Sequence, residues 1–66
     1  MILLECLTTK GDKCVFPWIY KGKDYDGCIT ADNDGVLWCS TKTDENDKHV
    51  EGNWGNCIKE CKKGKL

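Results

Sequence analysis

The sequence has no arginine, one histidine, one proline and no long apolar run. A nucleic-acid-binding domain would need a basic surface rich in arginine, whereas this chain balances ten basic residues, all lysines, against eleven acidic ones. A membrane-spanning helix would need an apolar run of about 18 residues or more. These absences exclude nucleic acid as the expected partner and predict no transmembrane segment.

Motifs for catalysis and metal binding are also missing. The chain has no Cys-x-x-Cys pair, and His49 lies far from any cysteine, which argues against a zinc module. His49 has no evident nucleophile, so we expect a solvated loop histidine and no enzyme. Asp32-Asn33-Asp34-Gly35 is similar to the start of a calcium loop, but the glutamate at the calcium spacing is absent, which favours a plain turn. The sequence predicts no catalytic residue, no metal and no cofactor.

What the chain does contain is cysteine, at a density typical of disulfide scaffolds. Sixty-six residues form one domain and bury too little apolar surface to be stable without covalent or metal staples. Such bridges persist in oxidising surroundings, so we expect a secreted, extracellular protein. The cysteines stand at six positions, and their number alone leaves the pairing open: Cys6, Cys14, Cys28, Cys39, Cys57 and Cys61.

Aromatic residues gather between Cys14 and Cys28, which hold four of the six in the chain and the only proline. Alternation predicts an extended segment up to Tyr20, and Lys21-Gly22-Lys23-Asp24 predicts the turn of a hairpin. Further short strands are predicted at 28–30 and 36–39. The polar stretch 40–52 is predicted to be a long surface loop.

These motifs together resemble the fibronectin type II domain. The matching residues are Cys14-Val-Phe-Pro-Trp-Ile-Tyr-Lys-Gly-Lys, Tyr25 before Cys28, Asp34-Gly35 before Leu37-Trp38-Cys39, and Trp54-Gly55-x-Cys57. The resemblance implies a small disulfide-rich fold of two short antiparallel β-sheets with long loops, in one domain over 1–66 with its motif core at 14–57. It also implies Cys14–Cys39 and Cys28–Cys57 bridges, which leaves Cys6 and Cys61 for a third bridge joining the terminal extensions.

The resemblance further implies a non-enzymatic binding module with an exposed aromatic pocket. In the family this pocket binds collagen or gelatin chains, or choline headgroups, because flat rings pack on proline-rich chains and attract quaternary ammonium. We expect Trp18 and Tyr20 to be exposed and Phe16 to lie in the core, while Trp38 and Trp54 could serve either role. The candidate ligand-binding residues are Trp18, Tyr20, Tyr25, Trp38 and Trp54.

Departures from the family pattern support an alternative function. Asn56 stands where the family often has an aromatic residue, and the 40–53 loop lacks the family's tyrosine. The alternative is a stand-alone secreted effector of the venom or saliva type that inhibits an ion channel, receptor or protease. A candidate basic patch could contact glycosaminoglycan, an anionic membrane or another acidic partner: Lys59, Lys62, Lys63 and Lys65. Under either hypothesis we expect a monomer whose partner is an extracellular protein, a matrix component or a lipid headgroup.

Overall fold

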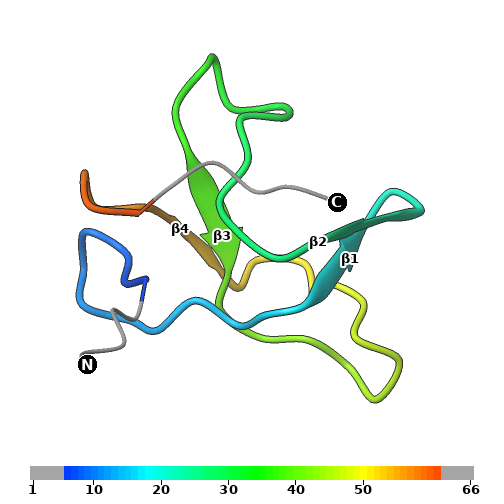
Figure 1. Cartoon of the computed structure of the whole chain (residues 1–66). Helices are drawn as coiled ribbons and strands as arrows, with labels where there is room; N and C mark the ends of the chain where they lie inside the picture. The colour runs from blue at the N-terminus through cyan, green and yellow to red at the C-terminus, as the bar shows by residue number, and fades with distance from the viewer. Residues whose placement is uncertain (1–5, 62–66) are drawn as a thin grey trace.

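The computed structural model describes residues 6–61, which form two separate two-stranded antiparallel sheets joined by long loops (Figure 1). In the first sheet β1 (Trp18–Tyr20) pairs with β2 (Lys23–Tyr25). In the second, β3 (Trp38–Ser40) pairs with β4 (Trp54–Asn56). This architecture confirms the predicted fold class. Within residues 6–61 there is no helix with the length and apolar character needed to cross a membrane.

The first sheet is the predicted hairpin. Its register places Trp18 opposite Tyr25 and Tyr20 opposite Lys23, so the connection is Lys21-Gly22. The predicted turn at 21–24 was too long, because residues 23 and 24 belong to β2. Both connecting residues have positive φ, 49° and 81°, as a type I′ turn requires. The glycine adopts this conformation without a Cβ penalty, and the turn chemistry therefore explains why the chain reverses here.

The other edge of β1 is covered by the polar loop. Ile19 N donates to Asp47 O at 2.7 Å, and His49 N donates to Ile19 O at 2.9 Å, which makes a parallel bridge between Ile19 and Lys48. The loop is also closed on itself, because Asp44 N donates to Lys48 O at 2.9 Å. The predicted surface loop at 40–52 is thus a hydrogen-bonded segment that packs along β1.

The segment at 28–30, which lies beside β3 of the second sheet, is less regular than predicted. Ile29 and Trp38 exchange both backbone hydrogen bonds, at 2.9 and 2.8 Å, and Cys28 and Ile29 are bridge residues without a regular strand. The predicted strand at 28–30 is therefore wrong as a strand and is an isolated bridge. The next segment, Ala31 to Gly35, is a turn, as predicted for the aspartate-rich stretch within it.

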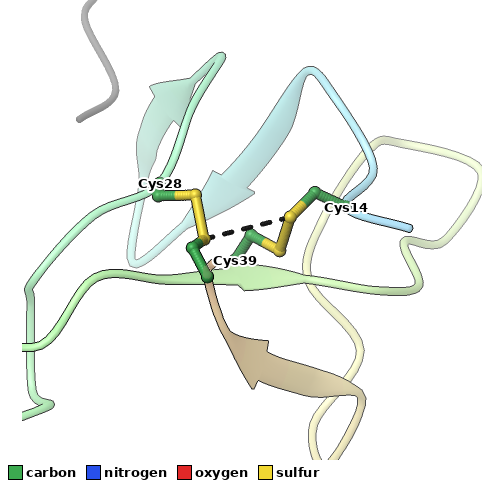
Figure 2. A group of neighbouring side chains, drawn as sticks. Cys14, Cys28 and Cys39 are labelled. Atoms are coloured by element: carbon green, nitrogen blue, oxygen red, sulfur yellow. Dashed lines mark hydrogen bonds between the residues drawn. A yellow bond between two sulfur atoms is a disulfide. The ribbon is translucent and has the colours of Figure 1, made fainter. Parts of the chain in front are cut away.

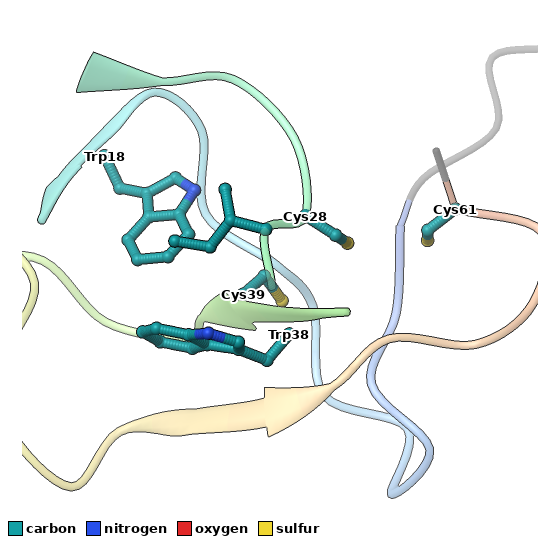
Figure 3. Close-up of a cluster of buried hydrophobic side chains, with 6 residues drawn as sticks. Trp18, Cys28, Trp38, Cys39 and Cys61 are labelled. Atoms are coloured by element: carbon teal, nitrogen blue, oxygen red, sulfur yellow. The ribbon is translucent and has the colours of Figure 1, made fainter. Parts of the chain in front are cut away.

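The core is made of tryptophan rings and sulfur. The indole of Trp18 is completely buried, and its Nε1 donates to Gly27 O at 3.2 Å. Trp38 packs edge-on against it, with ring centroids 4.9 Å apart (Figure 3). Disulfides join Cys14 to Cys39 and Cys28 to Cys57, the pairing that the family resemblance implies. Figure 2 shows how closely the two bridges approach one another.

Two predictions of aromatic exposure are wrong. Trp18, expected at the surface, has no exposed area, because its ring is packed against Trp38 from β3 and against Tyr25, its partner across the hairpin, whose ring centroid lies 5.6 Å away. Phe16, expected in the core, is 37 % exposed. The regular strand begins only at Trp18, and residues 16 and 17 form a bend, so the alternation that would place Phe16 beside Trp18 does not apply there.

The first and last described segments lie side by side. Ile58 N donates to Leu7 O at 3.0 Å, and Thr8 forms an antiparallel bridge with Cys57. The Sγ atoms of Cys6, Cys28 and Cys61 lie within 4.8 Å of one another. The Cys6–Cys61 bridge stays a prediction, one that this geometry accommodates. Lys59 is exposed. The rest of the candidate basic patch, Lys62, Lys63 and Lys65, lies outside the described residues, as does the apolar start of the chain.

Candidate functional site

A hollow of about 190 Å³ opens where the two sheets and the polar loop meet. Its volume is below the roughly 300 Å³ that a site for a drug-sized ligand needs, so it suits a single ring or a small headgroup. Tyr20 comes from β1, Trp38 from β3 and Trp54 from β4, while the remaining residues come from loops. The full lining is Tyr20, Asp32, Asn33, Trp38, His49, Glu51, Gly52 and Trp54.

The aromatic walls of the hollow follow from strand register. Ser40 is paired with Trp54, and Trp38 lies two residues before Ser40 on the same face of β3. Trp38 and Trp54 are therefore diagonal neighbours, with ring centroids 5.8 Å apart at 80°. Tyr20 meets Trp38 at 5.1 Å and 87°. Trp54 is 47 % exposed, so part of its side chain remains open to a ligand.

Trp38 itself is nearly buried and serves as the floor. Its side chain is 5 % exposed, and its Nε1 donates to Ala31 O at 2.7 Å. This hydrogen bond satisfies the only polar atom of the ring and holds the indole between the rings of Trp18 and Trp54. Trp38 therefore offers apolar surface to the hollow.

One end of the hollow is polar and charged. Asp32 accepts hydrogen bonds from Tyr20 Oη at 2.8 Å and from Lys21 Nζ at 2.9 Å. The Lys21 ammonium, followed by the Tyr20 hydroxyl, holds the pKa of Asp32 below its usual value, and the hydrogen bond to Asp32 raises the pKa of Tyr20. The Tyr20 hydroxyl is therefore a donor already engaged by Asp32.

Asn33, the residue after Asp32, also lines the hollow and is hydrogen-bonded to Asn56. Asn33 Nδ2 donates to Asn56 Oδ1 at 2.9 Å and to Val36 O at 2.9 Å. Asn56 occupies the position where the family often has an aromatic residue, and here its side chain accepts a hydrogen bond from the lining residue Asn33. Asn33 was not predicted as a site residue, because it was read only as part of a turn.

His49 is the main residue that sequence reasoning missed. Its ring lies 5.5 Å from Trp38, 5.8 Å from Trp18 and 5.9 Å from Tyr20, measured between centroids. Nδ1 lies 2.7 Å from Ser40 Oγ. Burial lowers the pKa of His49, and Glu51 opposes that shift. The prediction of a solvated loop histidine is wrong, because the parallel bridge to Ile19 draws the loop onto β1.

The structure brings together some of the predicted ligand-binding residues and not others. Tyr20, Trp38 and Trp54 line the hollow. Trp18 is sealed beneath it, so its predicted contact with ligand is wrong, and its role is to support the rings above. Tyr25 packs on Trp18 away from the lining. Within residues 6–61 the side chains close enough to share a metal ion are cysteines, and four of them are already bonded in pairs.

A second hollow adjoins the first. Four residues line both hollows, so the two hollows adjoin; the surface that they form together is hereafter called the aromatic groove. The shared residues are Tyr20, Asp32, His49 and Glu51, and the second hollow adds Ile19, Lys21, Gly22 and Lys48.

Comparison with known proteins gives a consistent result. The model of the fibronectin type II domain matches residues 14–57. The chain is 42 % identical over 50 residues to the 72 kDa type IV collagenase of Gallus gallus, an overlap of 74 % of this chain and 7 % of the collagenase. It is 44 % identical over 50 residues to the cation-independent mannose-6-phosphate receptor of Homo sapiens, covering 76 % of this chain and 2 % of the receptor. This chain therefore spans a small part of both relatives. No solved structure matches it.

Proposed function

Since the chain belongs to the fibronectin type II family, whose domains act as binding modules, we propose that it is a non-enzymatic module that binds a collagen-like chain through its aromatic groove. The observation that carries this proposal is that two adjoining hollows share four lining residues and so offer a binding surface longer than one ring-sized pocket. A groove that continues beyond one ring-sized pocket accommodates an extended chain better than an isolated headgroup.

The chemistry of the groove supports a proline-rich ligand. Trp38 and Trp54 meet nearly at right angles and form an apolar corner against which a flat pyrrolidine ring can pack. An extended proline-rich chain loses little conformational entropy on binding, because its backbone is already restricted. One relative is by its name a collagenase, and the part of it that matches is the domain found here.

A choline headgroup is the second ligand that the groove could accept. Glu51 lines the hollow together with Trp54, and a carboxylate with an aromatic face attracts a quaternary ammonium group. Lys21 and Lys48 stand along the second hollow and disfavour a cation there. The groove therefore favours a collagen-like chain over a choline headgroup, and the experiment below tests both ligands.

We place the protein in an oxidising, extracellular setting. Its core contains two disulfides and little apolar side-chain mass besides Trp18, Ile29 and Trp38, so the fold depends on covalent bridges. Glutathione would reduce such bridges in a cytosol. Secretion is consistent with a matrix protein as the ligand.

Gelatin-affinity chromatography tests the proposal. Trp54→Ala removes the open wall of the groove and should weaken retention at least about tenfold, as truncation of a central aromatic contact usually does. Phe16→Ala is the matched control, because Phe16 is an exposed aromatic residue outside the groove lining. We expect the native protein and the Phe16 variant to be retained.

Other outcomes are equally informative. If the native protein passes through the gelatin column but is retained on immobilised phosphocholine, the choline headgroup is the ligand that the result supports. Passage through both columns would contradict the binding module and favour the secreted effector. Equal loss of retention in the Trp54 and Phe16 variants would show that the groove is not the contact surface.

A further inference from the structure

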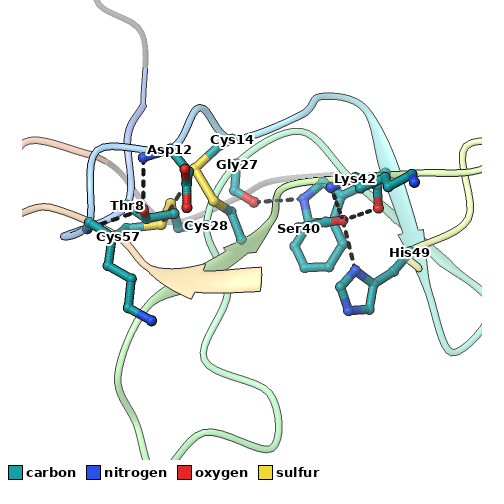
Figure 4. The surroundings of a disulfide bond; sticks show 12 residues. Thr8, Asp12, Cys14, Gly27, Cys28, Ser40, Lys42, His49 and Cys57 are labelled. Carbon is teal, nitrogen blue, oxygen red and sulfur yellow. Dashed lines mark hydrogen bonds between the residues drawn. A yellow bond between two sulfur atoms is a disulfide. The ribbon is translucent and has the colours of Figure 1, made fainter. Parts of the chain in front are cut away.

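The hydrogen bonds around Ser40 determine which ring nitrogen of His49 carries the proton. Ser40 Oγ lies 2.8 Å from Lys42 O, and two oxygens at this distance repel unless a proton lies between them, so the serine hydroxyl donates to Lys42 O (Figure 4). That hydroxyl has no second proton to give. His49 Nδ1, at 2.7 Å from the same Oγ, must therefore be the donor.

This assignment leaves an acceptor in the aromatic groove. A neutral imidazole with hydrogen on Nδ1 has a lone pair on Nε2, at the ring edge directed away from Ser40. Ser40 is fully buried, whereas His49 lines both hollows, so the Nε2 edge is the part of the ring available to the groove. Within residues 6–61 no protein group donates a hydrogen bond to Nε2, whereas the neighbouring Tyr20 hydroxyl already donates to Asp32.

We propose that His49 is the specificity-determining and pH-sensitive residue of the groove, and that its Nε2 accepts a hydrogen bond from a donor on an otherwise apolar chain. This inference rests on the proposed function. In a collagen-like chain the donor is either the hydroxyl of hydroxyproline or the backbone N–H of glycine. Both donors present the same chemistry to Nε2.

Protonation would abolish this interaction. Imidazolium carries hydrogen on both nitrogens, so Nε2 can no longer accept, and a charge would stand among apolar rings. Asp32 is already paired with Lys21, so the carboxylate left to favour the imidazolium is that of Glu51. The charged and titratable groups that face His49 across the groove are Tyr20 from β1, Lys21 from the hairpin turn, Asp32 from the 31–35 turn, and Lys48 and Glu51 from its own segment.

The expected pH range follows from burial. Packing against the three aromatic rings lowers the pKa of His49 below its ordinary value of 6.5. The ring is then neutral at pH 7, and binding is lost as the pH falls through that lowered pKa. Affinity should fall about tenfold for each pH unit below the pKa of the free protein, because only the neutral form binds.

The first test needs no ligand. His49 is the only histidine, so its ring signals in a nuclear magnetic resonance spectrum need no assignment by mutation. We expect nitrogen shifts of a neutral ring protonated on Nδ1 at pH 7.5, and a titration midpoint below 6.5. A ring protonated on Nε2 at pH 7.5 would overturn the inference.

The second test measures binding to blocked, single-chain Pro-Hyp-Gly and Pro-Pro-Gly repeat peptides at pH 7.5 and at one pH unit below the titration midpoint found in the first test. The amide nitrogen of Asn in His49→Asn replaces the Nδ1 donor to Ser40 but leaves no acceptor at the Nε2 position. His49→Gln is the matched variant, since its longer amide can present an oxygen near that position. Near-ultraviolet circular dichroism confirms that each variant is folded.

We expect the native protein to bind at pH 7.5 and to lose about tenfold affinity for each pH unit below the His49 titration midpoint found in the first test. The Asn variant should bind weakly at both values, and the Gln variant should bind without pH dependence. A preference for the hydroxylated peptide identifies the hydroxyl as the donor, and equal binding of the two peptides identifies the glycine N–H.

Two failures can be told apart. If the native protein binds but its affinity does not change with pH, or the Asn variant keeps the native profile, the inference is wrong and the proposed function stands. If the native protein binds neither gelatin nor the peptides at any pH, the proposed function fails and the ligand role of His49 fails with it.

Discussion

Gly55 is expected to be the least replaceable residue of β4, because the chain has no room for a side chain there. A Cβ at this position would lie 2.6 Å from Thr8 Cγ2 and 2.7 Å from Thr8 Cβ, well inside van der Waals contact. Thr8 is 1 % exposed, and its own hydrogen bonds restrain it. Its N donates to Asp12 O at 2.8 Å, and its Oγ1 accepts from Asp12 N at 3.1 Å and Lys10 N at 3.3 Å. The glycine of the Trp-Gly-x-Cys motif therefore makes room for the N-terminal segment.

The Gly55→Ala substitution should lower the free energy of unfolding by about 2–3 kcal/mol. Overpacking of a closed site costs roughly 1–3 kcal/mol, and the upper half of that range applies because Thr8 cannot move without losing hydrogen bonds. In a domain of this size a loss of about 1 kcal/mol lowers the melting temperature by roughly 4–8 °C. Guanidinium unfolding of the oxidised protein, followed by tryptophan fluorescence, measures the change.

A double variant tests the stated cause. Thr8→Ser removes Cγ2, the nearest clashing atom, and keeps the hydroxyl that accepts from Lys10 and Asp12. Combined with Gly55→Ala it should recover part of the lost stability, so the two substitutions should be non-additive. If Gly55→Ala changes the free energy of unfolding by less than about 0.5 kcal/mol, the value typical of unconstrained surface positions, the steric argument is wrong.

Two further predictions follow from the cysteines and from Asp32. The denatured, unreduced chain should show no free thiol with Ellman's reagent, and free thiol in this assay would contradict the third bridge. The double substitution Cys6→Ser and Cys61→Ser should lower the free energy of unfolding by about 3–4 kcal/mol through loop-closure entropy. Asp32→Asn should bring the pKa of Tyr20 back toward 10.0, measured by phenolate absorbance, because the hydrogen bond to Asp32 is the main cause of its elevation. The pKa of Asp32 is held below 3.8 in the folded state, so its contribution to stability is present above pH 3.8 and disappears as the pH falls through the lowered value; the Asn variant should lack this acid-dependent loss. An unchanged Tyr20 titration in the variant would argue against the hydrogen bond.

Local chemistry made much of the fold predictable. The hairpin at 18–25 depends on a two-residue turn in which both residues take positive φ. Gly22 adopts this conformation readily, so the turn can be recognised from adjacent residues in the sequence. The two-sheet architecture was implied by the resemblance to the fibronectin type II domain, which rests on the order of the cysteine and tryptophan motifs. The same reasoning identified Tyr20, Trp38 and Trp54, which do line the aromatic groove.

Tertiary packing decided which rings are covered. Alternation along a strand shows that two side chains share a side, but the segments that pack on that side are distant in sequence. Trp18 is buried because Trp38 from β3 packs against it, and Phe16 is exposed because it precedes β1. His49 lies in the groove because a parallel bridge joins Ile19 to Lys48, which are 29 residues apart in the sequence. Composition and local pattern therefore determined the disulfide-rich class and the hairpin, and the family resemblance pointed to most of the aromatic walls. The exposure of each ring and the place of the histidine depended on long-range contacts that only the folded chain brings together.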